Sequence, residues 1–135
     1  MRVLITGASG LLGGRLIDFL FKQNKYTLSM LTRDSKENNY LKKYGSVIDV
    51  DWENQDQLND ILKKTDVVIH AFGPTAKTCL DDPINQISLY KKYTHNLLKA
   101  SELNRVSKII LLSSIHVYSE NPYGNIDEEN SLTNN

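Results

Sequence analysis

The sequence predicts an α/β fold in which helices cover both faces of a parallel, doubly wound sheet. Apolar segments of strand length alternate with amphipathic segments of helix length along the chain. Three regularly spaced glycines separate the first apolar segment from the first amphipathic one. The chain has 135 residues, 40% of them hydrophobic and 24% charged, which is typical of a single globular domain. We therefore expect one domain over residues 1–135.

Short apolar runs predict the strands of the sheet. They lie at residues 2–6, 27–32, 47–51, 66–72 and 108–113. The fourth run is apolar without alternation, as expected for a parallel strand that is covered on both faces. Because right-handed crossovers join parallel strands, we expect the order 3-2-1-4-5. The ligand crevice should then lie at the carboxyl ends of the first and fourth strands.

Helical periodicity predicts the segments between these strands. Apolar residues recur at helical spacing over residues 11–23, 55–64 and 82–104. Asp82 and Pro83 suit the cap and the first position of the last helix. Residues 35–44 are polar and predict a loop with a weak surface helix. The chain becomes polar after Tyr118, which predicts a loop there.

Composition excludes several classes of function. Lys plus Arg and Asp plus Glu both number 16, so no charged surface for nucleic acid or membrane lipids is expected. No apolar run reaches the roughly 20 residues of a spanning helix, and the run at residues 3–5 is too short for a signal peptide. Cys79 is the single cysteine, which excludes an intrachain disulfide and favours a cytoplasmic protein. No metal site is expected.

The segment Gly7-Ala8-Ser9-Gly10-Leu11-Leu12-Gly13 has the pattern GxxGxxG between the first strand and the first helix. Gly7 permits a tight turn, Gly10 lets the backbone approach a pyrophosphate, and Gly13 lets the helix pack closely against the sheet. The amino end of the helix offers N–H groups and a positive dipole to phosphates. We therefore predict that Gly7, Ser9, Gly10, Leu11, Leu12 and Gly13 bind a dinucleotide. The alternative is a turn with a structural role only.

Thr32-Arg33 ends the second strand, where an acidic residue would bind the adenosine ribose and select NAD. Arg33 can instead pair with a 2′-phosphate. This favours NADP over NAD, with Ser35 and Lys36 as possible helpers. A solvated surface arginine is the alternative, and Asp34 could contact a ribose hydroxyl, which leaves NAD open.

The segment RVLITGASGLLGGRL, at residues 2–16, resembles the opening of extended short-chain dehydrogenases/reductases of the NAD-dependent epimerase/dehydratase family. Two later segments resemble further marks of this family: HAFG at residues 70–73 resembles the HxA segment, and SSIHVY at residues 113–118 resembles SSxxVYG. The resemblance covers essentially the whole chain. It implies a Rossmann-type fold, a nicotinamide dinucleotide cofactor and a nucleotide-linked sugar as substrate.

The resemblance also implies a set of cofactor contacts. Asp51 would contact the adenine amino group, with Trp52 against the ring, although Asp51 could equally be a turn or cap residue. Backbone next to the ribose and nicotinamide would come from Ala71, Phe72 and Gly73, and Ser113 would also bind the cofactor. His70, in the same segment as Ala71, is expected to be structural rather than a catalytic base.

For catalysis, the resemblance implies that the Ser114 hydroxyl bonds to the substrate oxygen that becomes a carbonyl. Ile115 and His116 stand where dehydratases of the family carry an Asp–Glu pair, which argues against sugar 4,6-dehydration. None of the seven tyrosines has a lysine four residues later, so the family's YxxxK motif is missing. We therefore expect a chain that stops before the later strands, the YxxxK motif and the substrate domain, and that is inactive by itself.

The helix at residues 82–104 resembles the family's NxxGT helix, with Tyr90 in place of Asn and Tyr93 in place of Gly. This helix often forms the dimer contact in the family, so a homodimer is possible. The function expected of the whole protein is hydride transfer at a sugar carbon by an NAD(P)-dependent epimerase, reductase or dehydratase. Three alternatives stay open: a non-enzymatic NADP(H) sensor, a reductase of small carbonyl compounds, and a structural or interaction module.

Overall fold

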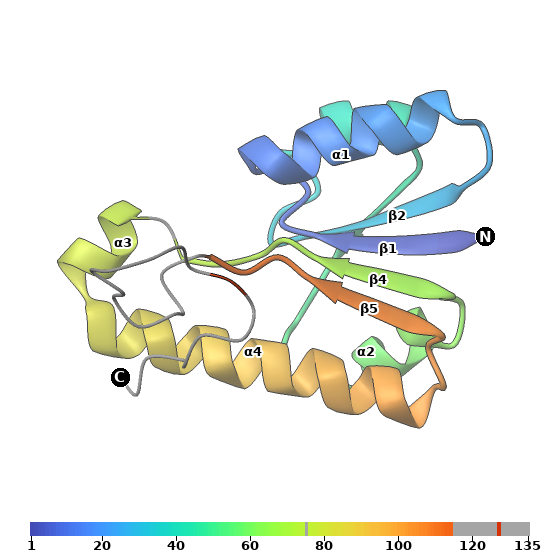
Figure 1. Ribbon diagram of the computed structural model, residues 1–135. Coiled ribbons are helices and arrows are strands. Elements are labelled where there is room, and N and C mark those ends of the chain that lie inside the picture. Colours follow the sequence, from blue (N-terminus) through green and yellow to red (C-terminus); the bar gives the residue numbers. More distant parts are fainter. Residues whose placement is uncertain (75, 115–126, 128–135) are drawn as a thin grey trace.

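The computed structural model describes residues 1–74, 76–114 and 127. It contains a five-stranded parallel sheet with the order β3-β2-β1-β4-β5 (Figure 1). The strands are β1 (Arg2–Thr6), β2 (Thr27–Thr32), β3 (Ser46–Asp49), β4 (Val67–His70) and β5 (Lys108–Leu111). The predicted fold class and strand order are confirmed.

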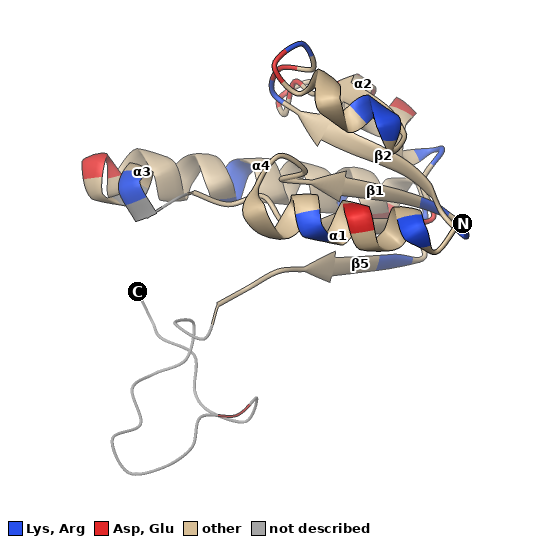
Figure 2. Ribbon diagram, turned by 90° about the horizontal axis from the view of Figure 1, so that it is seen from above, with Lys and Arg blue, Asp and Glu red and all other residues tan. Residues whose placement is uncertain are grey.

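Helices cover both faces of this sheet (Figure 1). On one face lie α1 (Leu11–Lys22) and the short 3-10 helix η1 (Asn39–Lys43). The other face is covered by α2 (Gln55–Leu62) and α4 (Pro83–Leu103), and α3 (Ala76–Asp81) precedes α4. Basic and acidic segments are interspersed on the outer elements rather than gathered by sign (Figure 2).

The capping interactions expected at the start of α4 are present. The Asn85 backbone N–H donates to Asp82 Oδ1 at 3.4 Å, and Pro83 occupies the first turn. At α2, the Asn54 side chain accepts a hydrogen bond from the Gln57 backbone N–H at 3.0 Å. The Gln57 side chain then donates to Asp49 O, at the end of β3, at 3.0 Å and accepts from Asp51 N at 2.7 Å. These bonds fix where both helices begin.

Several strands are shorter than predicted, and this corrects the expected boundaries. β3 ends at Asp49 instead of residue 51, β4 ends at His70 instead of residue 72, and β5 ends at Leu111 instead of residue 113. One ladder bond still follows each end, for example from Ala71 N to Thr6 O at 3.3 Å. The apolar sequence continues past β3 and β4 because Val50, Ala71 and Phe72 line the cleft described below, and past β5 because Leu112 packs against the core cluster that contains Ile5. Helix α3 was not predicted, because six residues are too few to show a helical period.

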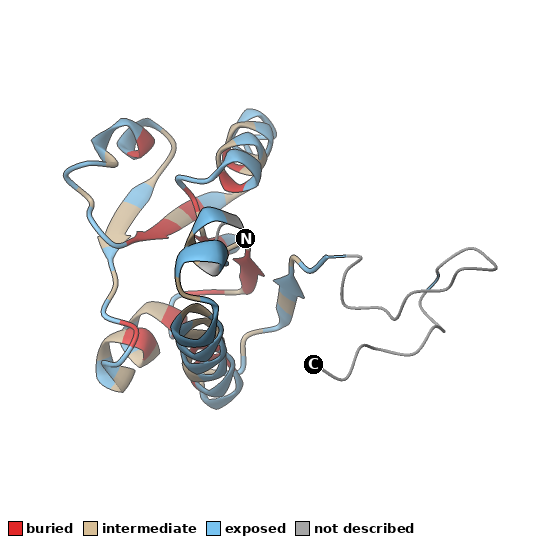
Figure 3. Ribbon diagram, turned by 90° about the vertical axis from the view of Figure 1, so that its left-hand side faces the viewer, coloured by how far each residue is buried: buried red, intermediate tan, exposed pale blue. Residues whose placement is uncertain are grey.

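The hydrophobic core forms two layers, one on each face of the sheet (Figure 3, buried segments in red). Ile5 and Met30 pack with Ile17 of α1 and Leu41 of η1 on one face. Leu4 and Val68 pack against α2 and α4 on the other face. Successive residues of β1 therefore serve opposite layers, as a strand covered on both sides requires.

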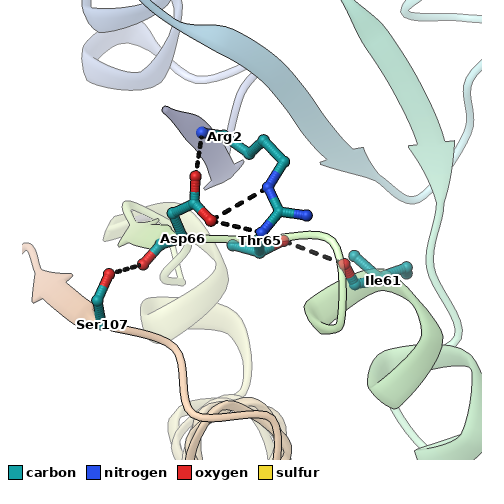
Figure 4. Close-up of polar contacts among 5 residues, drawn as sticks. All are labelled: Arg2, Ile61, Thr65, Asp66 and Ser107. Atoms are coloured by element: carbon teal, nitrogen blue, oxygen red, sulfur yellow. Dashed lines mark hydrogen bonds and ion pairs between the residues drawn. The ribbon is translucent and has the colours of Figure 1, made fainter.

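The amino ends of β1, β4 and β5 are joined by polar contacts around Asp66 (Figure 4). The Arg2 guanidinium donates to Asp66 Oδ1 at 2.5 and 3.1 Å, and the Arg2 backbone N–H donates to Oδ2 at 2.7 Å. Ser107 Oγ donates to the Asp66 carbonyl at 2.5 Å. The hydrogen bonds from Arg2 lower the pKa of Asp66 to about 2. This end of the sheet is held together far from the glycine segment.

No helix within the described residues combines the length and the apolar character needed to cross a membrane.

β5 is the last strand of the sheet among the described residues, and much of it is exposed. Ile110 and Leu111 are 44% and 49% exposed. On the α1 side, β4 and β5 border a mainly apolar hollow of about 380 Å³, lined by Met1, Val3, Leu20, Tyr26, Val67, Ile69, Ser107, Lys108 and Ile110.

We expect the isolated chain to self-associate through this edge at high concentration, because an uncovered apolar strand can pair with another chain. Light scattering should show an average mass that rises above the monomer mass as concentration increases. Ile110→Lys should reduce the rise, since a charge on an edge strand opposes such pairing. A mass that stays monomeric throughout would contradict the expectation.

Candidate functional site

A cleft of about 180 Å³ lies at the carboxyl ends of β1, β2 and β4, where the sequence places the ligand crevice. Its lining residues are Gly7, Ser9, Gly10, Leu31, Thr32, Arg33, Val50, Trp52, Ala71, Phe72 and Gly73. Most of the residues predicted to bind the cofactor are therefore brought together in one place.

The turn from β1 into α1 has room only for glycine at two positions. Gly7 has φ +68°, and a Cβ there would lie 2.5 Å from the Ala71 carbonyl oxygen. A Cβ on Gly13 would overlap the Gly7 carbonyl oxygen. A Cβ on Gly10 would lie 3.2 Å from that same oxygen, which is tight but less severe. The tight turn at Gly7 and the close packing at Gly13 agree with the sequence prediction.

The amino end of α1 is open to an anion. Its cap residue, Gly10, supplies no side chain, and its first turn contains no acidic residue. Within the described part of the chain, the backbone N–H groups of Leu11, Leu12 and Gly13 have no acceptor. The side chains of Leu11 and Leu12 are 74% and 60% exposed and do not line the cleft. Donors to a phosphate there can therefore come from the backbone of this turn and from Ser9, which lines the cleft.

The loop after β2 places Arg33 at the cleft. Thr32 is buried, whereas Arg33 is exposed and borders the cleft. Asp34 Oδ1 accepts hydrogen bonds from Lys36 N at 2.8 Å and from Glu37 N at 3.1 Å. That carboxylate therefore stabilises the loop's own turn.

Trp52 forms the wall of the cleft on the β3 side. It is only 6% exposed and stacks on Phe72, with ring centroids 5.5 Å apart. The Asn96 amide donates to the Trp52 carbonyl at 2.8 Å, which ties this turn to α4. Asp51 borders a neighbouring hollow rather than the cleft, and its Oδ1 accepts from Glu53 N at 2.9 Å. The adenine contact of Asp51 stays a prediction.

His70 lies beneath the cleft and is 1% exposed. Its Nδ1 lies 2.7 Å from Thr6 Oγ1, and its Nε2 lies 3.0 Å from Thr94 Oγ1. Burial lowers the pKa of His70 to about 4, so the ring is neutral at physiological pH. The ring joins β1, β4 and α4, which fits the structural role that was expected of it.

Aromatic residues of α4 extend the site in a way that the sequence analysis missed. Tyr93 stacks on Trp52 with centroids 5.7 Å apart, and Tyr90 stacks on His70 at 6.0 Å. They line a second hollow of about 360 Å³, which shares Trp52 and Phe72 with the cleft. Their spacing of three residues on a helix was the available signal, because such residues share a face.

Ser113 and Ser114 follow β5, are exposed and border neither hollow. The catalytic role of Ser114 and the cofactor contact of Ser113 stay predictions. Ile115, His116 and Tyr118 lie outside the described residues.

The fold is similar to that of solved nucleotide-sugar epimerases. UDP-glucose-4-epimerase from Stenotrophomonas maltophila, with bound NAD and formylated UDP-arabinopyranose, is 17% identical, with TM-score 0.83 and coverage of 98% of this chain and 43% of that one. UDP-glucuronic acid 4-epimerase from Bacillus cereus, in complex with UDP-glucuronic acid and NAD, is 25% identical, with TM-score 0.81 and coverage of 98% and 46%. UDP-glucose 4-epimerase from Bifidobacterium longum, with NAD⁺ and UDP, is 23% identical, with TM-score 0.80 and coverage of 99% and 43%.

The chain thus spans less than half the length of each of these structures. No curated protein sequence matches it. The model of the NAD dependent epimerase/dehydratase family matches residues 3–135. Together with the glycine turn and the sheet order, this match shows that the chain belongs to the NAD dependent epimerase/dehydratase family.

Proposed function

We propose that the chain binds a nicotinamide dinucleotide across the carboxyl ends of β1, β2 and β4. The observation that carries this proposal is the turn from β1 into α1. Gly7 and Gly13 leave no room for a Cβ there, and the amino end of α1 has backbone N–H groups without an acceptor among the described residues. This arrangement suits a pyrophosphate, because backbone donors and the helix dipole act on the same anion.

The remaining lining residues fit the other parts of such a cofactor. Arg33 borders the cleft where the adenosine ribose would end, and Trp52 borders it where the adenine would lie. The backbone of residues 71–73 follows β4 toward the nicotinamide side. These assignments rest on the family resemblance and on the fact that the residues line one cleft. None of them involves a metal ligand.

We further propose that the chain is the cofactor-binding portion of an NAD(P)-dependent epimerase, reductase or dehydratase acting on a nucleotide-linked sugar. Family membership and the UDP-sugar complexes of the similar structures support this substrate class. The bound nicotinamide would exchange a hydride with a sugar carbon. Ser114 would hydrogen-bond the oxygen on that carbon. Since no tyrosine here has a lysine four residues later, the chain alone is proposed to bind without catalysing.

Calorimetric titration of the chain with NADH and NADPH in parallel tests the proposal. Saturable binding of at least one of them is the expected result. Absence of binding to both, with a chain shown to be folded by circular dichroism, would contradict it.

Arg33→Asp is expected to weaken NADPH binding by about 10- to 100-fold while NADH binding changes little. The guanidinium can make charge-assisted hydrogen bonds to a 2′-phosphate, each contributing about 1.5–3 kcal/mol. The same titrations measure the effect, and Arg105→Asp is the matched control, since Arg105 is an exposed residue shortly before β5. Equal losses for both dinucleotides would show that Arg33 does not read the 2′-phosphate.

One observation favours a second candidate, a non-enzymatic NADP(H) sensor. Tyr90 stands where the family helix has Asn, and its ring stacks on His70 at an interplanar angle of 6°. The side-chain amide that the Asn provides in the family is therefore missing at this position. Sequencing the gene beyond codon 135 separates the candidates: a YxxxK motif in the same reading frame supports the enzyme, and a stop codon supports the sensor.

A further inference from the structure

We propose that Asp49 is a specificity-determining residue that opposes binding of a 2′-phosphate. The inference rests on the proposed dinucleotide site. Asp49 ends β3 and pairs in register with Thr32, the last residue of β2. The end of β2 is the position from which dinucleotide-binding folds distinguish a ribose hydroxyl from a 2′-phosphate. A carboxylate on the adjacent strand is therefore close to the place where that choice is made.

The Asp49 carboxylate is hydrogen-bonded to the loop that follows β2. Its Oδ1 accepts from the Ser35 backbone N–H at 2.5 Å and from Thr32 Oγ1 at 3.4 Å. Its Oδ2 accepts from Ser35 Oγ at 2.7 Å. Ser35 lies two residues after Arg33, so its backbone and hydroxyl donors belong to the loop that borders the cleft. Asp49 thus occupies both donors that Ser35 could offer to an incoming anion.

The negative charge of Asp49 also opposes binding of a 2′-phosphate. The Ser35 hydroxyl, followed by the Ser35 backbone, lowers the pKa of Asp49, so the carboxylate is ionised at physiological pH. A 2′-phosphate beside it would experience like-charge repulsion and would find the Ser35 donors already bound. The uncharged ribose hydroxyl of NAD would experience no comparable repulsion. In Figure 2, acidic and basic segments lie together in the loop beyond the carboxyl end of β2.

Arg33 and Asp49 therefore have opposite effects on the preference for a dinucleotide with or without a 2′-phosphate. Arg33 borders the cleft and attracts a 2′-phosphate, whereas Asp49 holds Ser35 and repels it. The preference of the wild-type chain is the difference between these two effects. Removing the charge of Asp49 should shift that difference toward NADPH.

Calorimetric titration of wild type and Asp49→Asn with NADPH and NADH tests this inference. Asparagine keeps an acceptor for the Ser35 N–H and donates to Ser35 Oγ, which leaves the Ser35 hydroxyl proton for the phosphate. We expect the NADPH affinity to rise about tenfold while the NADH affinity stays within about twofold. Asp60→Asn, which removes an equal charge from α2, is the control and should change neither affinity.

Asp49→Asn combined with Ser35→Ala should lose most of the gain in NADPH affinity, because the freed hydroxyl is then missing. An unchanged ratio of NADPH to NADH affinity in Asp49→Asn would overturn the inference alone. Loss of NADH binding in that variant would also overturn it, because Asp49 would then support the loop in general. A wild-type chain that binds neither dinucleotide would overturn the proposed function, and this inference with it.

Discussion

Gly13→Ala is expected to destabilise the chain by about 3 kcal/mol, because the new Cβ would overlap backbone rather than a movable side chain. Its nearest neighbour would be the carbonyl oxygen of Gly7, within the turn that joins β1 to α1. Neither β1 nor α1 can move without disturbing the core layer that contains Ile5 and Ile17. Urea unfolding followed by circular dichroism measures the loss.

The adjacent glycine provides a matched control. A Cβ on Gly14 would meet only Ala8 O, at 3.8 Å, an ordinary contact. Because alanine favours a helix interior over glycine, Gly14→Ala should stabilise the chain by about 0.5–1 kcal/mol. Changes of opposite sign in the free energy of unfolding at these two positions would distinguish the effect of close packing from that of helix propensity. Similar effects of the two substitutions would show that α1 does not lie as close to β1 as the structure places it.

The second large effect expected is a loss of stability on mild acidification, caused by His70. Its pKa is about 4 in the folded chain, against 6.5 for an unperturbed histidine. Between these values the unfolded chain binds a proton that the folded chain does not, so the free energy of unfolding falls with falling pH. The contribution is fully present above pH 6.5 and is lost as pH falls to about 4. A shift of this size corresponds to about 3 kcal/mol.

Urea unfolding at a series of pH values measures this effect, and His70→Gln removes the titrating group. Glutamine can hydrogen-bond to Thr6 and Thr94 without changing charge. The difference in unfolding free energy between wild type and variant should therefore shrink steadily from neutral pH toward pH 4. NMR titration of His70 supplies a direct check. A His70 that becomes protonated near pH 6.5, the value of an unperturbed histidine, would contradict the buried, neutral ring.

The arrangement of the strands could be predicted because hydrophobic burial in a parallel sheet leaves a strong pattern. The run at residues 66–72 is apolar on both faces, and the spacing of Gly7, Gly10 and Gly13 marks the turn that precedes α1. Strand ends were less predictable. Phe72 continues the apolar run beyond β4, yet it packs against Trp52 at the cleft and not within the sheet. Hydrophobic periodicity indicates that a residue is buried, but not whether it is buried within the sheet or against side chains at a cleft.

The candidate site was predictable where it follows from the ends of strands, and less so elsewhere. Arg33, Trp52 and Phe72 meet because the carboxyl ends of parallel strands share one edge. The stacking of Tyr90 depends on the rotation of α4 about its axis, which no local pattern specifies. The role proposed for Asp49 could not be predicted, because the sequence places the end of the third strand at Asp51, whereas β3 ends at Asp49.

The position of Trp52 gives the chain an intrinsic optical reporter. It is the single tryptophan, it borders the cleft, and its ring stacks on those of Phe72 and Tyr93, which also contact each other. All tryptophan fluorescence therefore originates beside the proposed adenine position. A dinucleotide entering the cleft would change the surroundings of this one emitter, and a reduced nicotinamide could accept its excitation energy. Occupancy of the site can thus be read from the unmodified protein.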